Sequence, residues 1–143
     1  MAYEMSSDRF SPEKRSDIMR RVKSRNTSTE ISVRKLLHRL GLRFRLHRTD
    51  LPGKPDIVLP RHRVAVFVNG CFWHQHRKCK RATVPAANHD WWSGKLARNV
   101  ERDRANVLLL KKMGWRVLTV WECELATVFR LETRLRRFFG QGA

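Results

Sequence analysis

The sequence predicts a single α/β domain, in which a mixed β-sheet is flanked by helices on both faces. Helical and strand-like segments follow one another in the order αα-βββ-α-β-α, which is typical of this class. The longest helical segment separates the two most apolar strands, so it is expected to cross over and leave them parallel. The 143 residues suffice for one hydrophobic core, and no repeat or linker divides residues 1–143.

Two helices are expected near the N-terminus. The first, a basic helix over about residues 12–23, follows a Ser-Pro pair whose proline occupies the first helical position. The second begins at Thr27 or Ser28, either of which can cap it, and ends at Gly41. Its apolar side chains fall on one side, as expected for a helix that covers a sheet: Ile31, Leu36, Leu37 and Leu40.

Three strands follow, and their patterns differ. Residues 42–48 alternate apolar and basic side chains, which is typical of an edge strand. After the turn-forming stretch LPGKPD, residues 56–60 and 63–70 are expected to form two strands around a short basic turn. The second of these is apolar nearly throughout, which indicates a strand covered on both faces.

The C-terminal half supplies the crossover helix, one more strand and a closing helix. Residues 93–114 form the longest helical segment, and residues 115–122 form the next buried strand. A last amphipathic helix is expected over about residues 125–139. Four apolar side chains of the long helix are expected to face inward: Leu96, Val100, Val107 and Leu110.

The charge of the chain indicates a polyanionic partner. Lys and Arg number 31 against 13 acidic residues, giving a net charge of +18, although 41% of residues are hydrophobic. Such a folded polycation repels itself unless an anion lies against it, so nucleic acid is the expected partner. No apolar stretch reaches the roughly 18 residues of a membrane span, and the N-terminus lacks a secretory signal, so the protein is expected to be cytoplasmic.

A cluster of potential metal ligands follows the apolar strand 63–70. The cluster contains Cys71, His76 and Cys79. Cys123 would lie beside them if a parallel crossover places the end of strand 115–122 next to the end of strand 63–70. Four such ligands would close a structural zinc site. The spacing is not that of a standard zinc finger. Two alternatives stay open: the cysteines are small buried hydrophobes, or His74 replaces His76 as ligand.

Asp56 and His74 are the candidates for catalysis. Asp56 stands at the start of a strand, where a carboxylate could hold a divalent cation against a phosphate, although an isolated Pro-Asp more often makes a local turn. An imidazole such as that of His74 can accept and release a proton, as a general base or water-orienting group requires. Glu30 on the second helix could support either residue.

Aromatic residues are expected on two loops near these candidates. Phe72 and Trp73 follow the apolar strand, and Trp91 and Trp92 are expected in a loop before the long helix. On a polycation such rings can stack on bases or wedge between them. The tryptophans of strand 115–122 are assigned to the core.

Four stretches in this order closely resemble the very-short-patch-repair (Vsr) DNA mismatch endonucleases: LPGKPDIVLP, GCFWHQH, RNVERDR and GWRVLTVWEC. The resemblance extends from the N-terminal helix to Cys123. It implies a restriction-endonuclease-like fold, catalytic magnesium and a structural zinc ion. It also implies nicking of DNA beside T:G mismatches that arise when 5-methylcytosine is deaminated.

The resemblance also implies roles for individual residues. Asp56 would be the principal magnesium ligand together with the backbone carbonyl of Val68, His74 the catalytic histidine and Glu30 a supporting acid. The zinc ligands would be Cys71, His76, Cys79 and Cys123. The DNA-contacting residues would be Met19 in the N-terminal segment of about residues 1–24, Phe72, Trp73 and Trp92. Asn69 and Asn99 are further candidates for contacts with DNA.

The chain departs from the family pattern just before Gly-Cys. Val68 and Asn69 stand where the best-known pattern has threonine and histidine, and an asparagine cannot shuttle a proton. The expected function is a magnesium-dependent nick 5′ to the thymine of a T:G mismatch in double-stranded DNA. The enzyme is expected to act as a monomer, with mismatch-repair proteins as candidate further partners. The alternatives are a nickase for other mismatches or DNA targets, and a zinc-stabilised DNA-binding module without catalysis.

Overall fold

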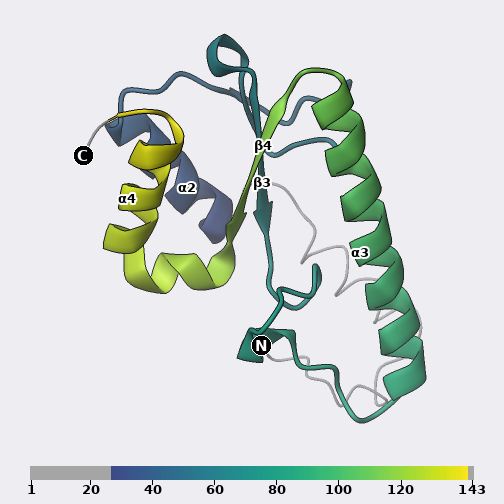
Figure 1. Ribbon diagram of the computed structural model, residues 1–143. Helices are drawn as coiled ribbons and strands as arrows, with labels where there is room; N and C mark the ends of the chain where they lie inside the picture. Colours follow the sequence, from purple (N-terminus) through teal and green to yellow (C-terminus); the bar gives the residue numbers. More distant parts are fainter. Residues whose placement is uncertain (1–26, 142–143) are drawn as a thin grey trace.

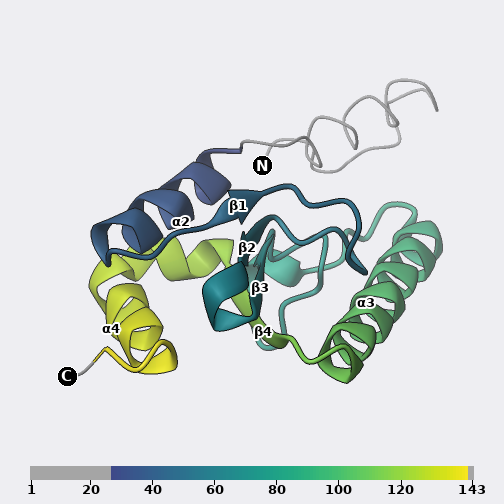
Figure 2. The ribbon, with the colours of Figure 1, turned by 90° about the horizontal axis from the view of Figure 1, so that it is seen from above.

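The computed structural model describes residues 27–141, so the helix predicted over residues 12–23 and its Met19 lie outside the described residues. A four-stranded sheet lies between α2 (Ser28–Arg39) and α4 (Val128–Phe138) on one face and α3 (His89–Lys112) on the other (Figure 1). Figure 2 shows the same two layers of helices from above. The predicted mixed sheet with helices on both faces is confirmed.

The sheet combines an antiparallel part with one parallel pair. Its order is β1 (Arg45–Leu46), β2 (Ile57–Leu59), β3 (Val64–Asn69) and β4 (Arg116–Trp121). The first three strands are antiparallel neighbours, whereas β3 and β4 run parallel over their full length. Because α3 provides the crossover, the C-terminal ends of β3 and β4 lie side by side, as predicted.

Hydrophobic cores lie on both faces of this sheet. Side chains of β2 alternate, so Ile57 and Leu59 pack under α2 and α4, whereas Val58 packs under α3. A third, smaller cluster lies beyond the end of β3 and comprises Phe72, Trp73, Trp92 and Leu96. Among the described residues, no helix is long and apolar enough to cross a membrane.

Three predicted boundaries were wrong. The edge strand predicted over residues 42–48 shortens to two residues, and His47 directly after it has a left-handed backbone with φ 51°. Helix α3 begins at His89, so the tryptophans of the DWW stretch lie in its first turn and not in a loop. The last helix begins at Val128, because Glu122–Thr127 form a 3-10 helix first.

Burial also corrects the predicted helix faces. Ile31 of α2 is 37% exposed, and Val33 is fully buried in its place. In α3, Leu96 and Leu110 are buried as predicted, whereas Val100 and Val107 are only half-buried. Residues 100–109 of the long helix contain no buried residue.

Candidate active site and metal centre

The four predicted zinc ligands meet at the end of the parallel strand pair. The ligand atoms of Cys71, His76, Cys79 and Cys123 all lie within 4.8 Å of one another. Nδ1 of His76 is 3.6 Å from Sγ of Cys71 and 3.4 Å from Sγ of Cys123. Three thiols and one imidazole form a donor set that could hold a zinc ion in a closed tetrahedral site.

Neighbouring groups hold these ligands in place. The ring of His76 stacks on Trp121 with a centroid distance of 4.1 Å, and the backbone N–H of Cys71 donates to Oε1 of Glu122 at 3.0 Å. Burial raises the pKa of the Cys71 thiol and of the Cys123 thiol. A bound metal ion stabilises the thiolate form, so it would offset the cost of deprotonating these buried thiols.

A carboxylate cluster lies at the start of β2. Oδ2 of Asp56 accepts a hydrogen bond of 2.7 Å from the backbone N–H of Val68, whereas Oδ1 accepts none from the described residues. Burial raises the pKa of the Asp56 carboxyl to about 6, and the nearby Glu30 charge acts in the same direction. In an extended strand the N–H and C=O of one residue point to the same side, so the Val68 carbonyl points to the side on which its N–H meets Asp56.

Glu30 is held beside Asp56 by two basic groups. It lies in the first turn of α2, is 4% exposed, and accepts hydrogen bonds from Arg34 at 2.9 Å and from Nε2 of His47 at 2.7 Å. The backbone N–H of His47 donates to the Asp56 carbonyl at 3.2 Å. Sequence reasoning missed His47, because the alternating pattern presented it as an ordinary basic residue of an edge strand.

His74 has a carboxylate partner on the crossover helix. Its Nδ1 lies 2.6 Å from Oδ2 of Asp103, and its charge lowers the pKa of Asp56, which places the imidazole near the carboxylate cluster. With Nδ1–H donating to Asp103, Nε2 carries the lone pair that a general base needs. Sequence reasoning missed Asp103 as well, although the RNVERDR stretch contains it.

The two asparagines occupy different environments. Asn69 is 9% exposed at the end of β3, and its side chain makes no hydrogen bond within residues 27–141. Asn99 is 3% exposed and donates to the Trp73 carbonyl at 3.1 Å while accepting from Arg102 at 3.3 Å. Asn99 therefore ties the loop after β3 to α3, and its amide is used within the protein.

The predicted wedge residues pack on one another. Phe72, Trp73 and Trp92 are 8%, 4% and 3% exposed, and their ring centroids are 5.1–5.8 Å apart. Trp91 is the exposed member of its pair, at 42%. The buried indole N–H of Trp92 has no hydrogen-bond partner among the described residues, and such an unsatisfied donor costs about 1–3 kcal/mol.

The fold resembles that of an endonuclease catalytic domain. The chain resembles the catalytic domain of a homing endonuclease with a TM-score of 0.56 and 20% sequence identity, covering 80% of this chain and 95% of that chain. At 20% sequence identity, the similarity between the two chains is a similarity of fold alone.

Sequence comparison gives the family. The model of the DNA mismatch endonuclease Vsr family matches residues 7–81. The chain is 51% identical over 129 residues to the type II nicking enzyme V.XorIIP of Xanthomonas oryzae, covering 90% of this chain and 94% of that protein. It is 45% identical over 111 residues to the DNA mismatch endonuclease Vsr of Escherichia coli, covering 78% and 70%. The chain belongs to the Vsr family of DNA mismatch endonucleases, and it is a nuclease.

The metal centre gives a first testable prediction. Cys123→Ala and His76→Ala should both lose bound metal and lower the melting temperature, because binding at a closed four-ligand site is coupled to folding. His74→Ala is the matched control and should keep about one metal ion per chain. Metal analysis and thermal unfolding of the purified proteins measure this. Loss of metal from His74→Ala, with retention by His76→Ala, would reverse the ligand assignment.

The raised pKa of Asp56 gives a prediction about stability. A carboxyl whose pKa rises from 3.8 to about 6 on folding favours the folded state most at low pH, and that contribution is lost as the pH rises through about 6. Without added divalent cation, Asp56→Asn should therefore be more stable than the unaltered protein at pH 7, by up to about 3 kcal/mol. Denaturant unfolding should show this advantage shrinking toward pH 4. An advantage independent of pH would contradict the prediction.

Proposed function

We propose that this enzyme is a magnesium-dependent endonuclease that nicks one strand of double-stranded DNA 5′ to the thymine of a T:G mismatch. The observation that carries the proposal is the position of the Asp56 carboxylate beside the carboxyl-terminal end of β3, with His74 paired to Asp103 nearby. Family membership supports the mismatch target, since relatives are named as nicking enzymes and as a mismatch endonuclease. One nick needs one copy of this site, so a monomer suffices.

The residues around Asp56 fit a magnesium ion. The Asp56 carboxylate and the Val68 carbonyl would hold it, and when bound it supplies Lewis-acid polarisation of the phosphate. Two acids, Asp56 and Glu30, are close enough for the charge of Glu30 to raise the pKa of Asp56. A cation removes that repulsion, and hard oxygen ligands suit magnesium.

His74 is proposed to move the proton of the attacking water. Its Nε2 accepts the proton, while Asp103 holds the ring through Nδ1–H and stabilises the imidazolium that forms. Glu30 acts as a positioning residue, because Arg34 and His47 fix its carboxylate beside Asp56. Asn69 can donate a hydrogen bond to a phosphate oxygen but cannot transfer a proton.

Zinc is proposed to have a structural role. Its four ligands tie residues 71–79 to the 3-10 helix that follows β4, and the same loop carries Phe72, Trp73 and His74. A closed ligand set leaves no open position for substrate. The ion would therefore hold the catalytic histidine and the aromatic cluster in place without taking part in hydrolysis.

The aromatic cluster is proposed to open and wedge into DNA. Phe72, Trp73 and Trp92 are buried without DNA, so insertion requires them to separate from one another. The unsatisfied indole N–H of Trp92 makes the closed cluster less stable than a fully satisfied core. Unstacking a base step costs a few kcal/mol and costs least at a defective pair, so the wedge favours a mismatch.

A nicking assay tests the proposed activity. The unaltered enzyme with magnesium should nick a T:G duplex on the thymine strand and leave the matched T:A duplex intact. Asp56→Asn and His74→Ala should each lower the nicking rate at least about a hundredfold, in the range of general acid–base contributions, whereas the exposed Asp50→Asn should not. Denaturing electrophoresis of end-labelled strands measures the rate.

The assay also separates the alternatives. Nicking of other mismatched duplexes but not of T:G would replace the proposed target. Tight binding to mismatched DNA without nicking in any divalent cation would identify a DNA-binding module, and the catalytic assignments would then be wrong.

The wedge makes a separate prediction about binding. Trp73→Ala should weaken binding to a T:G duplex much more than to a T:A duplex, by on the order of 1–3 kcal/mol for a lost stacking contact. Phe129→Ala is the matched control, because that ring is 81% exposed on α4 and lies outside the aromatic cluster. It should leave the ratio of the two affinities unchanged. Fluorescence anisotropy without magnesium measures both affinities. An unchanged T:G to T:A ratio in Trp73→Ala, Phe72→Ala and Trp92→Ala would make these rings scaffold.

A further inference from the structure

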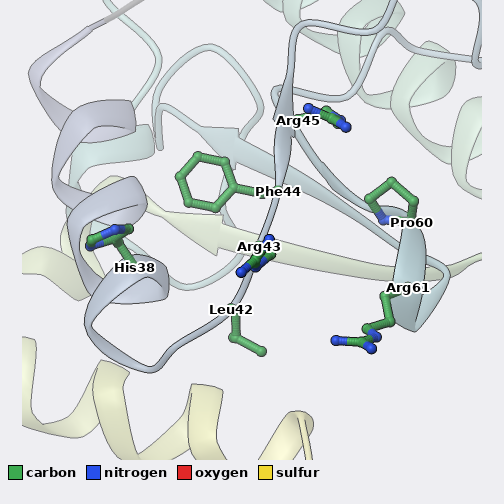
Figure 3. Close-up of a pocket in the computed structure, with 7 residues that line it drawn as sticks. All are labelled: His38, Leu42, Arg43, Phe44, Arg45, Pro60 and Arg61. Atoms are coloured by element: carbon green, nitrogen blue, oxygen red, sulfur yellow. The ribbon is translucent and has the colours of Figure 1, made fainter.

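A basic groove lies between α2 and the segment that leads into β1. It consists of two adjoining hollows of about 770 Å³ and 420 Å³ that share His38 and Phe44. The larger is lined by His38, Leu42, Arg43, Phe44, Arg45, Pro60 and Arg61 (Figure 3). The smaller is lined by Arg34, Lys35, His38, Arg39 and Phe44.

Arg34 and Arg39 of the basic groove pair with Glu30 and Glu132, whereas its other three arginines have no acidic partner among the described residues. Neither set of lining residues contains an aspartate or a glutamate. The side chains of Arg43, Arg45 and Arg61 make no hydrogen bond or ion pair within the part of the chain that the structure describes, whereas Arg48 and Arg136 each pair with an acid. Unpaired guanidinium groups around one hollow repel one another, and an anion in the hollow removes that repulsion.

The basic groove begins at the candidate active site. Arg34 lines its smaller hollow and also donates to Glu30. Arg45 pairs with Val58 across the sheet, two residues beyond Asp56, and Arg43 lies further in the same direction. At about 3.3 Å per residue along a strand, the backbone of Arg45 is offset from Asp56 by about 7 Å along the sheet, and that of Arg43 by about 13 Å. DNA rises about 3.4 Å per nucleotide of one strand, so this span equals about two to four nucleotides.

Phe44 indicates which part of DNA fits the basic groove. Figure 3 shows its ring directed from the β1 segment toward α2, between His38 and the strand. The ring is half-buried and packs against the core under α2 and α4. Binding of single strands relies on aromatic rings with a face free for bases, whereas guanidinium groups above an apolar floor suit phosphates.

We propose that the basic groove binds the sugar-phosphate backbone of duplex DNA, two to four nucleotides from the nicked phosphate. Arg43, Arg45 and Arg61 each contact a phosphate, and the contact fixes the position of the duplex relative to Asp56. The inference rests on the proposed function for DNA as the substrate, and it adds a binding site that neither the carboxylate cluster nor the aromatic wedge includes.

Salt dependence of binding tests the basic groove. The full chain and a triple variant, Arg43→Ala with Arg45→Ala and Arg61→Ala, are titrated with an uncleaved T:G duplex without magnesium at several salt concentrations. The slope of log Kd against log salt should fall by up to about 2.7 in the triple variant, which is about 0.9 for each lost phosphate contact. The matched control removes three exposed charges from α3, through Arg104→Ala, Lys111→Ala and Lys112→Ala, and should change the slope by less than about 1.

Neutral phosphates locate the contact on the DNA. Methylphosphonates placed two to four nucleotides on either side of the nick position should weaken binding by the unaltered protein at least about threefold on one side and leave the triple variant unaffected. Equal slope changes in both triple variants, or no effect of methylphosphonates at any of these positions, would overturn the proposal. If the triple variant does not fold, the methylphosphonate series on the unaltered protein decides the question.

These outcomes are independent of the nicking assay. A reduced slope together with absence of nicking on every mismatch leaves the basic groove in place and removes the proposed activity. An unchanged slope together with normal nicking removes the basic groove as a DNA-binding site and leaves the proposed activity in place.

Discussion

The parallel pairing of β3 with β4 is the interaction on which the site depends. Six successive residue pairs, from Val64 with Arg116 to Asn69 with Trp121, hold the two strands in one register. A strand pair fixed in this way ends at one place, so Cys71 and Cys123 emerge beside each other although 51 residues separate them. A shift of one residue in the register of β4 against β3 would turn the side chains of β4 to the opposite face of the sheet and separate the candidate metal ligands.

The crossover that makes this pairing parallel also supplies the hydrogen-bond partner of His74, the proposed general base. Helix α3 follows the loop after β3 in the chain and runs back along the sheet to β4. Its first half therefore lies beside that loop. Asn99 and Asp103 lie one turn apart on that helix, and they hold the Trp73 carbonyl and the His74 ring. One connection thus provides the topology of the sheet and the partner of the proposed base.

The site conflicts with the stability of the fold in two places. Asp56 and Glu30 are buried near each other, and burial raises the pKa of Asp56 because the ionised carboxylate loses hydration. On the outside, Arg43, Arg45 and Arg61 of the basic groove lack acidic partners within the described residues. Both features are unfavourable in the free protein and become favourable when a cation and a polyanion are present. The charges that cost stability are therefore those that indicate function.

The sequence by itself determined the α/β class and the parallel strand pair, which follow from periodicity and from the crossover rule. Residue types made the cysteines, the histidines and Asp56 candidates for a site, and the resemblance to a family selected His76 as metal ligand and His74 as catalytic residue. Only the tertiary structure decided that His47 holds Glu30, that Asp103 holds His74, and that the wedge rings bury one another. Each of these contacts joins residues from separate elements, and local sequence contains no information about which side chains will meet. Burial and hydrogen-bond partners depend on how the elements pack together, so they are defined only when the chain is folded.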